Sequence, residues 1–415
     1  MDSNIISMRS LVCILAILGY IVVARFLRYR RRDALLHRFG YGTSKPLGAM
    51  TTEDAASIYR ELSEMEFPFS FLNSKFALFR TYGIGSMSRL LVATKQITSP
   101  HIIPKRLADT NVLMFEIEGS SPSSARWHEA VARTNRIHEA YRKSGKISNE
   151  DMLYTLSLFA GEPLKWITSY EWRGFTIMEK AAIGTFWKGV GDAMEIDMSL
   201  LPSGGSSRDG WTDGSHWLDE LLIWSEDYES QHMLPDVNSH KLAMETLNYI
   251  LWPVPKALKT LGFWAVQSLM DDRLTKTMML ERAPQFFYAS TSIALALRCI
   301  FLRYFALPRP DIWRVRYVEE ATNEHGRYNS LMYGGLPIYI KANVTWRWNL
   351  QAWIFWALGK PIPGDDGDAY LPHGYDLKAI GPRSLPASGP DAATILKEKL
   401  RLRGGCPFSQ FSCKT

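Results

Sequence analysis

The chain has 415 residues, of which 46% are hydrophobic, 12% aromatic and 22% charged, and this globular composition excludes a disordered, collagen-like or low-complexity chain. Four scattered cysteines form no CxxC pair, so the sequence supports neither a disulfide framework nor a zinc ribbon. The net charge of +6 comes almost entirely from residues 1–38, which carry seven arginines against two aspartates. The remaining chain is nearly neutral, which excludes the broad basic surface of a nucleic-acid-binding domain.

The first predicted element is a membrane anchor. Ser10–Ala24 carries no charge, and Phe26 and Leu27 continue the apolar run past Arg25, whose long side chain can snorkel to the interface. This gives about twenty residues, enough to cross a bilayer as a helix. The arginine cluster follows the run and no small-residue cleavage site does, which favours an uncleaved single-pass anchor over a signal peptide. The positive-inside rule places the following chain in the cytosol, and the glycosylation sequon at Asn343 can test this orientation.

The rest of the chain predicts an all-α fold, because apolar residues recur at helical spacing and strand-like alternation is rare. Cap and proline signals predict helices that begin at Thr51, at Pro104 (to Glu118), at Ser121-Pro122 (to Gly145) and at Ser148. The uncharged run Pro284–Leu297 is short for a span and predicts a buried or interfacial helix.

A domain plan follows from these elements. It comprises a short lumenal tail (1–8), a transmembrane anchor (9–28), a basic juxtamembrane linker (29–50), a helical catalytic domain (51–307) and a mostly irregular C-terminal extension that packs on the core (308–415). Within the extension, Trp346–Trp356 is rich in aromatic residues. Contact with a membrane near a substrate entrance and packing on the core are both open interpretations of this segment.

A histidine lies on the apolar stripe of the helix predicted to start at 121. Trp127, Val131, Thr134, His138 and Tyr141 are spaced 4, 3, 4 and 3, so His138 is expected to face inward. A neutral imidazole in an apolar interior is a suitable axial ligand for haem iron. The alternative is a core histidine that simply bonds a backbone carbonyl.

The preceding helix has polar residues on its apolar stripe. Arg106, Thr110, Leu113 and Ile117 are spaced 4, 3 and 4. An inward-facing Arg and Thr one turn apart call for a buried acceptor, such as a haem propionate, unless the arginine only snorkels from the helix start.

Weaker motifs indicate no further site. Asp271-Asp272 has no third aspartate for a diphosphate site, which disfavours a terpene-type enzyme, and we expect a salt bridge to Arg273 instead. Gly83-Ile-Gly85 follows no predicted strand, so a dinucleotide site is not expected. Cys406 lacks the surroundings of a haem-thiolate ligand and is interpreted as structural.

The motif Arg106-Leu-Ala-Asp-Thr110, followed 28 residues later by His138, resembles the pattern of the rubber oxygenase (latex-clearing protein) family. The chain is more similar to the fungal endoplasmic-reticulum-bound oxygenases of mycophenolic acid biosynthesis, over almost its whole length. The segments that carry this similarity are EFPFSFLNSKFALFRTYGI (66–84), ARTNRIHEAYRKSGKI (132–147), LYTLSLFA (153–160), EWR (171–173), AIGTFWKGVGDA (182–193), MDDRL (270–274) and GGCPF (404–408).

The resemblance implies a globin-like domain that binds haem b, with His138 as the proximal iron ligand and Arg106 and Thr110 as cofactor-binding and catalytic residues of the pocket. It also implies oxidative cleavage, with O2, of a carbon–carbon double bond in the farnesyl-type chain of a hydrophobic prenylated substrate, a meroterpenoid intermediate. The implied location is the endoplasmic reticulum membrane, with the anchor helix in contact with lipid.

The sequence departs from the rubber oxygenases at two places. Asp109 replaces a lysine of that family, so no distal lysine ligand is expected there, and Arg89-Leu90-Leu91 lacks the family's proposed carboxylate base. The base is therefore unassigned. A non-catalytic, membrane-anchored haem or isoprenoid binding protein built on the same pocket is the alternative function.

Overall fold

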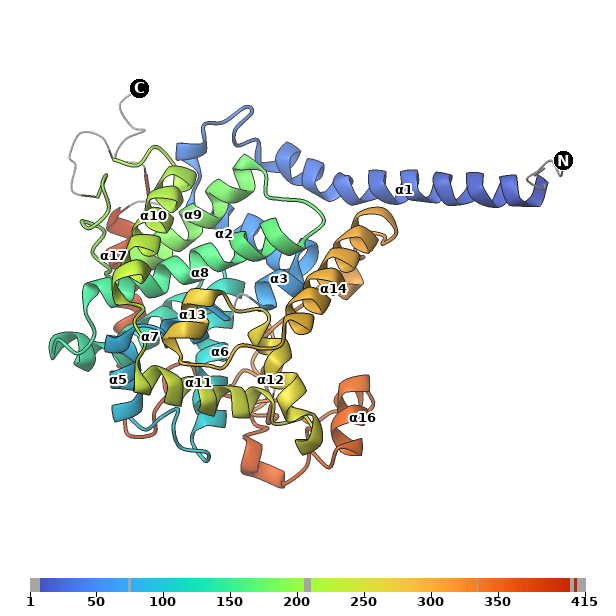
Figure 1. Ribbon diagram of the computed structural model, residues 1–415. Coiled ribbons are helices and arrows are strands. Elements are labelled where there is room, and N and C mark those ends of the chain that lie inside the picture. Colours follow the sequence, from blue (N-terminus) through green and yellow to red (C-terminus); the bar gives the residue numbers. More distant parts are fainter. Residues whose placement is uncertain (1–7, 74–75, 205–209, 334, 404–406, 409–415) are drawn as a thin grey trace.

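The computed structural model describes residues 8–73, 76–204, 210–333, 335–403 and 407–408, and their regular structure is helical apart from isolated β-bridges (Figure 1). The predicted all-α class is confirmed. In chain order the α-helices are α1 (Met8–Phe39), α2 (Thr52–Glu61), α3 (Pro68–Asn73), α4 (Phe76–Thr81), α5 (Gly85–Ala93), α6 (Ile103–Gly119), α7 (Ala125–Lys143), α8 (Asn149–Tyr170), α9 (Ile177–Ala193), α10 (Gly214–His232), α11 (Val237–Ile250), α12 (Lys259–Gln267), α13 (Asp272–Thr277), α14 (Gln285–Tyr304), α15 (Val344–Arg347), α16 (Leu350–Ala357) and α17 (Ala392–Arg403).

Helix α1 projects from the helical body as a long rod (Figure 1). Its apolar side chains are exposed along the projecting part, for example Leu15 and Val22. The other end packs on the body, where the ring of Tyr29 meets Trp172 at 5.1 Å and the Arg28 guanidinium lies 4.8 Å from the same indole. The predicted anchor and the start of the linker are thus one continuous helix. The predicted lumenal tail lies almost wholly outside the described residues.

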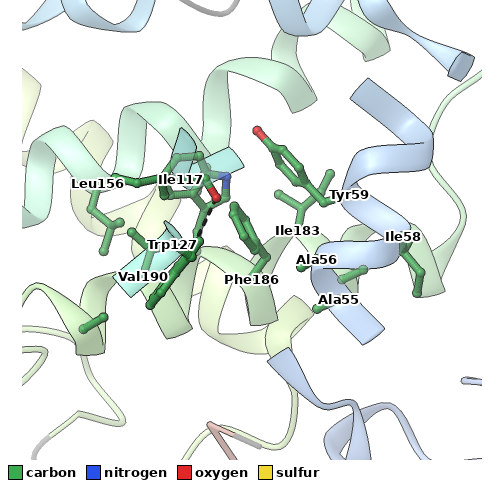
Figure 2. Close-up of a cluster of buried hydrophobic side chains, with 14 of the residues drawn as sticks. Ala55, Ala56, Ile58, Tyr59, Ile117, Trp127, Leu156, Ile183, Phe186 and Val190 are labelled. Carbon is green, nitrogen blue, oxygen red and sulfur yellow. Dashed lines mark hydrogen bonds between the residues drawn. The ribbon is translucent and has the colours of Figure 1, made fainter. Parts of the chain in front are cut away.

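Helix α9 forms the centre of the core, and α2, α8 and α10 pack around it. The ring of Tyr59 on α2 stacks on Phe186 at 4.6 Å, as Figure 2 shows. Helices α9 and α10 approach closely because Gly184 has no side chain: a Cβ there would lie 1.8 Å from the Gly214 carbonyl oxygen.

The predicted caps of α2 and α8 are confirmed, whereas the predicted start of α7 is not. The side chains of Thr51 and Ser148 accept from the third residue of α2 and α8 at 3.1 and 3.0 Å. The start at Ser121-Pro122 was wrong, because α7 begins at Ala125 with Ser124 as its cap, accepting from the Trp127 amide at 3.1 Å. The Ser121 hydroxyl instead donates to Glu53 at 2.6 Å, so it is not available as a cap.

The C-terminal extension is mostly irregular and packs on α6 and α7, the helices that carry the predicted site residues. Asp109 of α6 is buried and accepts from Tyr339 Oη and Lys105 Nζ, both at 2.7 Å. Two turns further along α6, the buried Glu116 accepts a short hydrogen bond from Tyr375 Oη. Tyrosines of the C-terminal extension, far away in the sequence, thus hold α6 in position.

Two apolar segments lie at the surface. Helix α14 extends to Tyr304 and is longer than predicted. The prediction left a buried or an interfacial helix open, and the buried alternative was wrong because no residue of α14 is buried. Helices α1 and α14 are the two described helices long and apolar enough to cross a membrane. In α16, Ala352 and Phe355 are buried in a small cluster, whereas Trp353 and Trp356 are exposed, so this segment both packs on the body and presents an aromatic surface.

Candidate functional site

A cavity of about 230 Å³ lies between helices α5, α6, α7, α8 and α9, and most of its wall is apolar. It is lined by the whole stripe of α6, Arg106, Thr110, Leu113 and Ile117, and by Thr134 and His138 from the stripe of α7. Folding therefore brings the three predicted site residues to one cavity.

The imidazole of His138 is fixed by its own helix. Its Nδ1 lies 2.9 Å from the carbonyl oxygen of Thr134, one turn earlier. A carbonyl only accepts, so Nδ1 carries the proton and Nε2 presents its lone pair. No partner for Nε2 is found among the described residues, and the ring borders the cavity.

The charge state of His138 follows from its surroundings. Burial, with the nearby Arg106 cation as a second cause, lowers the pKa of His138 to about 4. The ring is therefore neutral at pH 7. A neutral imidazole whose second nitrogen is held by a carbonyl has the arrangement that metal-binding histidines use.

Arg106 and Thr110 form a pair on α6 that also lines the cavity. The Arg106 guanidinium donates a short hydrogen bond to Thr110 Oγ1, and the Thr110 hydroxyl donates to the Arg106 carbonyl at 2.9 Å. No carboxylate in the described part of the chain forms an ion pair with Arg106. Since a partly buried cation is normally paired, this arrangement leaves a site for an anionic group.

Leu90 and Leu91 also line the cavity. The stretch that lacks the rubber-oxygenase carboxylate therefore does reach the site, as apolar wall. Asp109 accepts from Tyr339 and Lys105 and is absent from the cavity lining, so its role is to hold α6 against the C-terminal extension. Its burial raises its pKa.

The sequence did not identify two charged residues that reach the cavity edge. Lys146 is exposed and Asp151 is buried, and both also border a more polar pocket next to the cavity. Asp151 completes the cap of α8 by accepting from the Ser148 amide at 3.4 Å, and its Oδ1 also accepts from Ser86 at 2.7 Å and from Tyr228 at 3.1 Å. In the sequence, an acidic residue three positions after the predicted cap Ser148 is explained by capping alone, and no further signal marks Asp151.

The aspartate motif has a structural role that differs from the expected one. Asp271 caps α13 through the Leu274 amide and forms a short ion pair with Arg80, whereas Arg273 pairs with Glu226 at 2.9 Å and Glu229 at 3.2 Å. The expected Asp–Arg273 bridge was wrong, because Asp271 faces Arg80 on α4. Cys406 lies outside the described residues.

Among the described residues, no three His, Cys, Asp or Glu side chains gather as a metal-binding cluster. The cavity instead presents a single neutral imidazole, that of His138. None of the aromatic residues of Trp346–Trp356 lines the cavity.

Comparison with known proteins identifies the family of the chain. No family model matches the chain. Among curated proteins, "ER-bound oxygenase mpaB'" of Penicillium brevicompactum is 40% identical over 395 residues, which cover 94% of this chain and 93% of that protein. "ER-bound oxygenase mpaB" of the same species is 38% identical over 379 residues (89% of each chain), and its namesake in Penicillium roqueforti is 42% identical over 264 residues, or 63% of this chain and 88% of that protein. Identity at this level across nearly the whole length shows that the chain belongs to the MpaB-type family of ER-bound oxygenases.

Proposed function

We propose that this protein is a haem-dependent oxygenase, anchored in the endoplasmic reticulum membrane, that cleaves a carbon–carbon double bond in the isoprenoid side chain of a meroterpenoid intermediate. The observation that carries the proposal is the shared cavity of His138, Arg106 and Thr110. The oxygenase names of the relatives support the reaction class.

The residues present fit haem b. His138 would hold the iron through Nε2, because its Nδ1 is occupied by the Thr134 carbonyl and its ring is neutral. The Arg106 guanidinium has free donors for a propionate carboxylate, and Thr110 holds that guanidinium in place. When bound, haem supplies the redox centre with which dioxygen reacts, since no side chain does so.

The cavity wall suits an isoprenoid chain. Leucine, isoleucine, methionine and aromatic side chains surround the polar residues, including Leu107, Met152 and Phe159. Such a wall would exclude water and hold an apolar chain beside Arg106 and Thr110. The anchor helix suits the same substrate class, because a prenylated molecule partitions into lipid, and the arginines after the apolar run favour a cytosolic catalytic domain.

An absorption spectrum of the detergent-solubilised full chain, with and without dithionite, tests haem binding. We expect a Soret band in the wild type and its loss in His138→Ala. Arg106→Ala and Thr110→Ala should retain haem and mainly lower oxygen consumption with a prenylated substrate. His240→Ala is a matched control, because its Nδ1 also meets a backbone carbonyl at 2.9 Å, outside the cavity.

Three results would decide against parts of the proposal. Full haem occupancy in His138→Ala would refute the ligand assignment. A wild-type chain that takes up no haem would refute the cofactor. Haem binding without oxygen consumption would favour the alternative, a non-catalytic haem or isoprenoid binding protein, which the same pocket could serve.

A further inference from the structure

We propose that α14 is a second membrane-contacting element, which lies in the bilayer interface beside the anchor helix α1 and immerses its exposed apolar stripe in the same phospholipid leaflet.

The stripe on α14 is continuous and faces outward. Phe286, Ile293, Leu297 and Phe301 are 72%, 60%, 60% and 57% exposed, and their spacings of 7, 4 and 4 put them on one face of the helix. A helix of a water-soluble domain normally turns such a stripe toward the core. Here the stripe points away from it, so the environment that covers it must be apolar.

The charged residues of α14 do not interrupt this stripe. The helix has two of them, Arg298 and Arg303. Arg298 is directed toward the body, where it donates to Glu171 and to the Tyr170 carbonyl, both at 2.9 Å. The Arg303 guanidinium lies 5.7 Å from the ring of Tyr304 and can snorkel toward phosphates.

Contacts with α1 set the depth of α14. The Tyr20 hydroxyl donates to the carbonyl of Phe305 at 2.7 Å, just beyond the last residue of α14. Tyr20 belongs to the uncharged run Ser10–Ala24, four residues before its end. At 1.5 Å per residue, the C-terminal end of α14 therefore lies about 6 Å inside the level at which the apolar run ends.

The arginines that follow this run mark the level of the lipid headgroups on the same pair of segments. Arg28 Nη1 donates to the Ala306 carbonyl at 3.3 Å and Arg31 Nη2 to the Arg309 carbonyl at 2.6 Å. After α14, the segment 305–309 thus runs along α1 from the uncharged run to the arginines that follow it. This continuity with the anchor identifies a bilayer, rather than a second protein, as the partner of the stripe.

The other half of α14 is tied to the body, which makes it interfacial and not a second span. Thr291 shares a hydrogen bond of 2.6 Å with Ser268, and Phe287 packs on Trp264 of α12 at 5.3 Å. These contacts and the Arg298–Glu171 pair would have to break for α14 to cross the membrane. In Figure 1, α14 and the tryptophan-bearing α16 lie on the side of the body toward which α1 projects, consistent with an aromatic membrane face.

Depth-dependent fluorescence quenching on the full chain tests the proposal. The four native cysteines, Cys13, Cys299, Cys406 and Cys413, are replaced by serine, and an environment-sensitive fluorophore is attached to Leu297→Cys or Phe301→Cys. The protein is reconstituted in phosphatidylcholine vesicles with and without nitroxide-labelled lipid. Ile223→Cys on α10 is the matched control, because Ile223 is an apolar side chain that is 73% exposed. In Figure 1, α10 lies on the side of the body away from α14.

We expect the labels at 297 and 301 to lose fluorescence to nitroxide lipids, the label at 301 more strongly because it is nearer Tyr20, while the label at 223 keeps its fluorescence. Equal quenching by nitroxide lipids of the labels at 297 and 223 would overturn the proposal. So would cross-linking between the 297 cysteines of two chains without lipid quenching, which would identify a second copy as the partner. These side chains are exposed, so the variants should melt at the wild-type temperature, and melting curves check this.

Discussion

Arg133 attaches the C-terminal extension to α7, five residues before His138. It is fully buried, and its Nε donates to the Ile380 carbonyl at 2.6 Å and its Nη1 to the Pro386 carbonyl at 2.7 Å. A third, longer bond reaches Ala379 at 3.3 Å. Burial lowers the pKa of Arg133, and no carboxylate among the described residues forms an ion pair with it. The backbone carbonyls therefore provide its stabilisation.

We predict that Arg133→Met releases this segment from the helix. A hydrogen bond with a charged partner contributes about 1.5–3 kcal/mol, so the two short bonds give a loss of about 3 kcal/mol at the lower limit. This corresponds to roughly a hundredfold rise in the fraction of molecules with the segment open. Methionine keeps much of the apolar stem, so the variant removes the hydrogen bonds more than the packing.

Hydrogen–deuterium exchange of the full chain measures this opening. Amides of Ile380 and Ser388 are protected by carbonyls within the same segment, at 2.9 and 2.8 Å, and should exchange faster by the predicted factor. Arg136→Met is the control, because Arg136 is exposed and pairs at the surface with Glu139, a contact worth less than about 1 kcal/mol. Unchanged exchange in Arg133→Met, or equal effects in both variants, would refute the reasoning.

Two further predictions concern acid stability and orientation. Burial by itself raises the pKa of Glu229, but hydrogen bonds from Arg80, among them Nε to Oε1 at 2.7 Å, outweigh it and hold this pKa below its usual 4.5. The unfolded chain therefore takes up the proton first, and the stabilisation, present above about pH 4.5, is lost as the pH falls further. Between pH 6 and pH 3 the melting temperature of Glu229→Gln should therefore fall less steeply than that of the wild type. Melting temperatures that fall equally steeply in the two proteins would contradict this prediction. Asn343 lies exposed at the start of α15, so it would be glycosylated if the domain were lumenal. After expression in a eukaryotic host, endoglycosidase treatment should leave the electrophoretic mobility of the protein unchanged. A change in mobility would reverse the proposed orientation.

The sequence alone predicted the helical class, the long apolar helix at the N-terminus and the inward-facing positions of Arg106 and His138, because each depends on local periodicity or capping. The Ser148 cap is such a case, since it needs only the amide of Asp151. Where local signals competed, prediction failed: Ser121 had the residue type of a cap, but Glu53 from another helix takes its hydroxyl.

Only the tertiary structure decided what each apolar stripe meets. Periodicity shows which face of a helix is apolar, and this face is the same whether it covers a cavity, a core or a lipid leaflet. Helices α6 and α7 turn their stripes into one cavity, whereas α14 turns its stripe outward. The ion pair of Asp271 with Arg80, 191 residues away, likewise depends on chain packing that no local pattern encodes.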